Sequence, residues 1–107
     1  MNIVAPNRAF HALADPSRRA IFDALARGEA PVKELTARFD ISQPAVSQHL
    51  AVLRDAGLVD SRREGRLVYY RVDPRGAQPL IDWIGYHQAL WTTSVRRLED
   101  LLDRMEG

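Results

Sequence analysis

The sequence contains no cysteine among its 107 residues. Disulfide bonds, thiolate metal sites and a cysteine nucleophile are therefore excluded. No apolar run approaches the roughly 18 residues that a membrane-spanning helix needs. Residues 1–6 lack a charged segment followed by an apolar one, so no secretory signal peptide is expected. We expect a cytoplasmic protein with no membrane partner.

Features on which enzymes depend are also missing. The sequence has no glycine-rich loop that could bind a phosphate and no carboxylate pair spaced to line a cleft. Its three histidines, His11, His49 and His87, are scattered along the chain, so no metal cluster is predicted. These absences argue against an enzyme, and we expect neither a metal nor another cofactor.

The composition is that of an ordinary globular protein, with 46% apolar and 27% charged residues. The length fits a single domain over residues 1–107. A net charge of +1 says little, but residues 62–71 contain four arginines and one acidic residue. Positive charge gathered in this way is suited to contacts with phosphates.

A helix with clear end signals is predicted over residues 42–56. Ser42 is a good N-cap, Pro44 is tolerated in the first turn, and Gly57 fits a left-handed C-terminal stop. One face is apolar and carries Val46, Leu50 and Leu53. The opposite face is small and mostly uncharged, with Pro44, Ser47, Gln48, Ala51, Arg54 and Asp55. Such a helix is suited to insertion into a DNA major groove.

Three shorter helices are predicted before this one. The first begins near Asn7, Asp15 caps the second, and Pro31 opens the third. The third helix and the 42–56 helix, joined by about four residues, form a helix-turn-helix pattern. Arg18 and Arg19 lie in the first turn of the second helix, where they are either solvated or in contact with a phosphate or an acidic partner.

A β-hairpin is predicted over residues 58–72, because the apolar periodicity changes to two and a tight turn lies at Gly65. Residues predicted to face the core are Val68, Tyr70 and Val72, whereas Leu67, Tyr69 and Arg71 are predicted to face outward. Arg62, Arg63 and Arg66 make the tip basic. These arginines either contact DNA or keep an exposed hairpin soluble.

A long helix is predicted over residues 76–105, after a break signalled by Asp73-Pro74 and by residues 76–79. Its apolar stripe is wider than one small domain can cover, which indicates a dimerisation helix; packing within its own subunit is the alternative. The predicted interface residues are Leu80, Ile84, His87, Trp91, Val95, Leu98 and Leu102.

These motifs together resemble the ArsR/SmtB-type winged-helix transcriptional repressors. The resemblance rests on residues 11–22, 41–50, 53–59 and 63–72, and extends over about residues 8–105. It implies a mostly α, dimeric winged helix-turn-helix fold with five helices and a β-hairpin wing. It also implies a homodimer on an imperfect palindrome of double-stranded DNA, with repression relieved by a signal.

The resemblance implies groove contacts by Ser42, Gln43, Pro44, Ser47, Gln48 and His49, and wing contacts by Arg62, Arg63 and Arg66. The helical periodicity supports Ser47 and Gln48 best, whereas His49 lies nearer the apolar face and is either a DNA contact or half-buried structure. Arg54, near the helix C-terminus, either binds a phosphate or stabilises the helix dipole.

Many members of this family sense metals, and this sequence departs from them. Residues 32–36 lack the paired cysteines of one family site, and Asp82 and His87 are spaced too far apart for the other. The chain therefore resembles the metal-independent branch, with an unidentified inducer. A small molecule could bind near Trp83, Tyr86 and Trp91, although such rings are more often interface core. A winged-helix protein-interaction module remains the alternative function.

Overall fold

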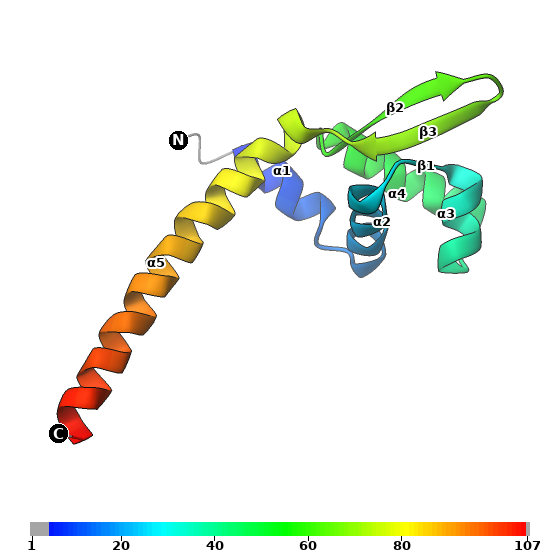
Figure 1. Ribbon diagram of the computed structural model, residues 1–107. Coiled ribbons are helices and arrows are strands. Elements are labelled where there is room, and N and C mark those ends of the chain that lie inside the picture. The colour runs from blue at the N-terminus through cyan, green and yellow to red at the C-terminus, as the bar shows by residue number, and fades with distance from the viewer. Residues whose placement is uncertain (1–4, 107) are drawn as a thin grey trace.

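The computed structural model describes residues 5–106, and side chains from residue 7 onward (Figure 1). Residues 1–4, part of the segment in which no signal peptide is expected, lie outside the described residues. The elements in order are α1 (Ala5–Ala12), α2 (Pro16–Arg27), β1 (Ala30–Pro31), α3 (Val32–Phe39), α4 (Gln43–Asp55), β2 (Val59–Glu64), β3 (Leu67–Val72) and α5 (Pro74–Glu106).

Four short helices form a body, from which the β2–β3 hairpin and α5 extend to opposite sides (Figure 1). The molecule measures 67 × 31 × 20 Å, a length that α5 largely accounts for. The predicted fold class, mostly α with five helices and a hairpin wing, is confirmed for one subunit. Among the described residues, no helix has the length and apolar character needed to cross a membrane.

The predicted starts of α2 and α4 agree with the structure because they depend on local hydrogen bonds. The Asp15 carboxylate accepts the Ser17 N–H at 2.7 Å, and the Ser42 hydroxyl oxygen accepts the Ala45 N–H at 3.2 Å. The hydrogen bond from the Ser17 N–H also holds the pKa of Asp15 below its ordinary value. Gly57 has a φ of +79°, as a left-handed stop after α4 requires.

Two predicted boundaries are wrong. Pro31 does not open the third helix but pairs with Tyr69 in the two-residue strand β1, and α3 begins at Val32. The break predicted at residues 76–79 is absent, since α5 begins at Pro74 and contains them. The Asp73 carboxylate accepts the Arg75 N–H at 3.0 Å and starts the helix two residues earlier.

The core lies between α2, α3, α4 and the start of β2. Its largest fully buried side chains are Ile21, Leu35, Val46, Leu50, Leu53, Leu58 and Val59. Tyr70 and Val72 pack against them, as the predicted inward face of β3 requires. The apolar stripe of α4 is therefore committed to the body, and the opposite side of that helix remains accessible.

The first turn of α5 lies directly against the turn that follows α4. A Cβ atom added at Gly76 would meet the carbonyl oxygen of Gly57 at 1.5 Å, so the two backbones approach as only glycine permits. Ala77 and Leu80, in the first turns of α5, are buried against the body. Trp83 packs edge-on against Phe10 of α1, with ring centroids 4.8 Å apart. These contacts set the direction in which α5 leaves the body.

Arg18 and Arg19 have a role that the sequence did not suggest. The Arg18 side chain donates hydrogen bonds to the carbonyl oxygens of Ala12 and His11, and the Arg19 side chain donates to those of Leu13 and Ala14. The carbonyls of His11 and Ala12 lie in the last turn of α1, and those of Leu13 and Ala14 lie in the turn that follows it. The two arginines therefore join α1 to α2.

Candidate nucleic-acid interface

Helix α4 presents an exposed polar face opposite its buried stripe. The exposed positions include Ser42, Gln43, Pro44, Ser47, Gln48, Ala51 and Arg54. His49 is half-buried at the border of the two faces. The face is rich in side chains that can donate and accept hydrogen bonds, and its small residues allow close approach to base edges.

The turn between α3 and α4 consists of Asp40, Ile41 and Ser42. Asp40 adopts a left-handed φ of +53°, a conformation that aspartate tolerates better than most residues. Ile41 packs against the core. The result is a helix-turn-helix unit in which α3 supports α4 and leaves its polar face in solvent.

Arg63 and Arg66 are exposed near the tip of the hairpin, where Gly65 turns the chain with a φ of +63°. Within residues 7–106, neither arginine takes part in an ion pair. Arg54, at the end of α4, is also exposed. These three cations are available to phosphates.

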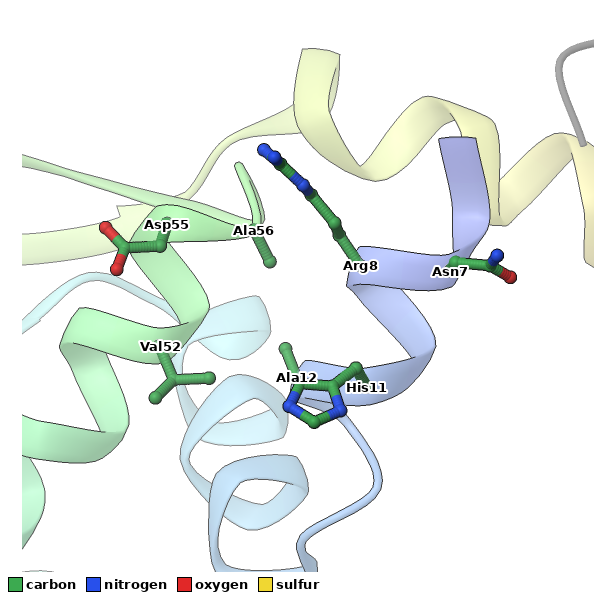
Figure 2. A pocket seen from close by; sticks show the side chains of 7 residues that line it. All are labelled: Asn7, Arg8, His11, Ala12, Val52, Asp55 and Ala56. Atoms are coloured by element: carbon green, nitrogen blue, oxygen red, sulfur yellow. The ribbon is translucent and has the colours of Figure 1, made fainter. Parts of the chain in front are cut away.

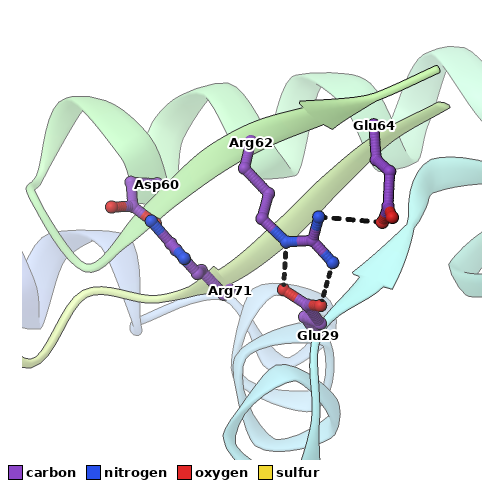
Figure 3. A network of polar contacts seen from close by, with 5 residues as sticks. All are labelled: Glu29, Asp60, Arg62, Glu64 and Arg71. Carbon is purple, nitrogen blue, oxygen red and sulfur yellow. Dashed lines mark hydrogen bonds and ion pairs between the residues drawn. The ribbon is translucent and has the colours of Figure 1, made fainter. Parts of the chain in front are cut away.

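Arg62 is placed differently from its neighbours (Figure 3). Its Nε donates to Glu29 at 2.9 Å, its Nη2 donates to the other oxygen of Glu29, and its Nη1 donates to Glu64 at 2.9 Å. The hydrogen bond from Arg62 lowers the pKa of Glu29, and the hydrogen bonds to Glu29 and Glu64 raise the pKa of Arg62. In the free protein this arginine is committed to two carboxylates.

Most of α5 exposes apolar side chains to solvent. Among the predicted interface residues, the exposed ones are Ile84, Trp91, Val95, Leu98 and Leu102. Leu80, also predicted there, is buried within its own subunit because the first turns of α5 lie on the body. His87 is half-buried and stacks on Trp83, with ring centroids 3.8 Å apart.

The rings of Trp83, Tyr86 and Trp91 do not gather into one site. Trp83 packs on Phe10 and His87, whereas Trp91 is 70% exposed and lines a shallow hollow along α5. A cavity of about 440 Å³ lies instead between α1 and the C-terminal half of α4 (Figure 2). Its lining residues are Asn7, Arg8, His11, Ala12, Val52, Asp55 and Ala56.

No metal site is evident in the part of the chain that the structure describes. No three histidine, aspartate or glutamate side chains there lie close enough to hold an ion. Asp82 accepts a hydrogen bond from Gln78 at 2.8 Å, and Nδ1 of His87 lies 3.0 Å from the carbonyl oxygen of Trp83. The two residues considered for the helix site therefore have other partners.

Comparisons with known proteins also identify a helix-turn-helix protein. A helix-turn-helix domain family matches residues 13–62. The HTH-type transcriptional regulator Rv2034 of Mycobacterium tuberculosis is 41% identical over 92% of this chain and 90% of its own length. The transcriptional repressor SdpR of Bacillus subtilis is 35% identical over 73% of this chain and 87% of its own.

Solved structures show the same architecture. The crystal structure of an ArsR family transcriptional regulator matches with a TM-score of 0.71 and 33% identity, over 86% of this chain and 95% of that one. Reduced HlyU from Vibrio cholerae matches with a TM-score of 0.67 and 35% identity, over 78% and 87% of the two chains.

A helix-turn-helix unit with an exposed polar helix and a basic hairpin beside it defines a winged helix-turn-helix DNA-binding protein. The proteins that this chain is similar to are transcriptional regulators, which are not enzymes. The chain belongs to the ArsR family of transcriptional regulators.

Proposed function

We propose that the protein is a homodimeric repressor that binds a palindromic operator. The observation that carries the dimer is the apolar face of α5, a helix of 33 residues that is buried in its own subunit only at Ala77 and Leu80. Such a helix is about 50 Å long. Beyond the first turns, which lie on the body, its exposed large apolar side chains run from Ile81 to Met105, and such a face in water favours pairing with a second copy of itself.

A two-fold axis at α5 explains why the operator would be a palindrome. The two copies of α4 would enter successive major grooves about 34 Å apart, one helical turn of DNA. Ser47 and Gln48 are proposed to read base edges, with Ser42, Gln43, Pro44 and the half-buried His49 at the sides of the contact. Arg54, Arg63 and Arg66 are proposed to bind phosphates.

A gel-shift titration with the DNA upstream of the protein's own gene tests this proposal. We expect a sequence-selective shift at moderate salt, with two subunits bound per site. In a separate measurement, we expect lower transcription from the same promoter when it is fused to a reporter gene. Because SdpR of Bacillus subtilis is named a repressor, transcriptional repression is the expected outcome. Absence of any selective shift would favour the protein-interaction module instead.

Gln48→Ala should weaken binding to the operator by about 1–3 kcal/mol and leave binding to unrelated DNA nearly unchanged. Gln48 is exposed on the polar face of α4, so the substitution removes no contact within the subunit core. Competition gel shifts with operator and scrambled DNA measure the difference. Gln78→Ala, the same change at an exposed position of α5, is the control; it removes only the hydrogen bond to Asp82 of the same helix. Equal sequence preference in wild type and Gln48→Ala would show that the groove assignment is wrong.

Release by a small molecule is a second candidate function, favoured by the cavity between α1 and α4. Figure 2 shows Arg8, Val52, Ala56 and His11 around it, with the carboxylate of Asp55 turned away. The volume of about 440 Å³ is in the range of small-molecule sites. A compound that binds there should dissociate the operator complex of wild type but not of Ala56→Leu, whose larger side chain occupies the cavity.

A further inference from the structure

The side chain of Arg62 crosses the whole wing sheet. The strand order is β1-β3-β2, and Tyr69 of β3 is paired with Arg62 on one side and with Pro31 of β1 on the other. The guanidinium of Arg62 lies over the Tyr69 ring, 4.7 Å from its centre. It reaches Glu29, just before β1 (Figure 3). The ion pair with Glu29 therefore connects the outer strand of the wing to the body.

The Arg62–Tyr69 pair is the pair nearest the tip of the hairpin that has β1 beside it as a third strand. Toward the tip, the pairs Arg63–Val68 and Glu64–Leu67 belong to a two-stranded hairpin with no third strand beside them. A two-stranded hairpin alone is only marginally ordered in water. The direction in which Arg63 and Arg66 point therefore depends on how firmly the Arg62–Tyr69 pair is fixed to the body of the protein.

The chemistry of the contact favours a structural clip over a phosphate ligand. All three guanidinium nitrogens of Arg62 donate to carboxylates, in a forked geometry with Glu29. The side chains of Arg62 and Glu29 are only 34% and 35% exposed. Because side chains alternate along a strand, Arg62 and Arg63 also lie on opposite faces of the hairpin. One phosphate strand would not be expected to engage both.

We propose that Arg62 is a positioning residue that clips the wing to the body through Glu29, while Glu64 of the same strand binds its third guanidinium nitrogen, and so orients Arg63 and Arg66 toward the DNA. This inference rests on the proposed function, because it concerns the regulation of the same DNA interface. It replaces the direct DNA contact that the family resemblance implies for Arg62.

Glu29→Gln distinguishes the proposed clip from a purely electrostatic effect, because the two predict opposite changes in the affinity for operator DNA. Removal of a negative charge near a DNA interface ordinarily tightens binding. The clip predicts the reverse, about threefold to tenfold weaker operator binding, because the wing loses its connection to the body. Asp60→Asn is the matched control: it makes the same charge change, but its partner Arg71 lies within the same hairpin at 2.8 Å. We expect unchanged or tighter binding from it.

A double-mutant cycle between Arg62 and Arg66 tests the positioning role directly. In wild type, Arg66→Ala should weaken binding and lower the slope of log affinity against log salt by about 1.8, because the homodimer loses two phosphate contacts at about 0.9 each. In the Arg62→Ala background the same change should cost at least threefold less, since Arg66 is no longer held in place. Arg62→Lys should behave like Arg62→Ala, because lysine keeps the charge but not the fork.

Three results would overturn the clip: tighter binding by Glu29→Gln, additive losses for Arg62→Ala and Arg66→Ala, or wild-type binding by Arg62→Lys. Circular dichroism and thermal melting confirm that each variant is folded at the assay temperature. A wild-type protein that fails to shift operator DNA would instead contradict the proposed function. If wild type and Arg66→Ala behave as expected and Glu29→Gln binds more tightly, only the clip is wrong.

Discussion

Replacement of Val95 and Leu98 by glutamate should convert the proposed dimer into a folded monomer and weaken operator binding by about 10²- to 10⁴-fold. The two side chains are 45% and 55% exposed in the isolated subunit and lie one turn apart on the apolar face of α5. This part of α5 extends away from the body, so their replacement should leave the core of the subunit intact (Figure 1). Burial of four negative charges at a two-fold interface would be strongly unfavourable. A monomer binds each half-site independently, so it lacks the gain in affinity that comes from linking two DNA-binding domains.

Sedimentation equilibrium and gel shifts on full and half operators measure this effect. Thr93→Glu, on the opposite face of the same helix, is the control and should leave both the dimer and the affinity intact. Unchanged dimerisation of the double variant would show that α5 is not the interface. A monomer with wild-type affinity for the full operator would show that spacing by the dimer is not needed.

Gly76→Ala should destabilise the subunit by about 3 kcal/mol or more. The added Cβ would lie 1.5 Å from the carbonyl oxygen and 2.4 Å from the carbonyl carbon of Gly57. Both are backbone atoms, so no flexible side chain can move aside. The start of α5 would have to shift away from the end of α4, and Ala77 and Leu80 would lose burial.

Urea unfolding followed by circular dichroism measures this change in the free energy of unfolding. Gly85→Ala is the matched control, because it lies on the same helix and has no atom within 4 Å of the added Cβ. There we expect a gain of about 0.5–1 kcal/mol, the usual preference of a helix interior for alanine. Equal stabilities for the two variants would contradict the close backbone contact.

The parts of the site that the sequence predicted depend on short-range signals. Helix α4 was expected over residues 42–56 and is observed at Gln43–Asp55, because its N-cap, apolar spacing and glycine stop all act within a few residues. The hairpin was found for the same reason, since Gly65 and the period of two specify a turn between two strands. The exposed face of α4 followed from helical geometry once its apolar face was known.

Other features required the packed chain. The strand β1 has two residues, too few for any periodic signal, yet its pairing with β3 brings Glu29 within reach of Arg62. Strand alternation alone could have separated Arg62 from Arg63, but it could not have supplied the partner. Leu80 continues the apolar stripe of α5 in sequence, whereas its burial depends on where that helix meets the body.

By itself the sequence determined the helices, the hairpin turn and the polar face of α4, because propensity, capping and periodicity act between neighbouring residues. The tertiary structure alone decided which arginines of the wing are available to DNA and where α5 leaves the body. Those outcomes depend on pairs such as Glu29 with Arg62 and Gly57 with Gly76, far apart in sequence, which only the packing of the whole core brings together.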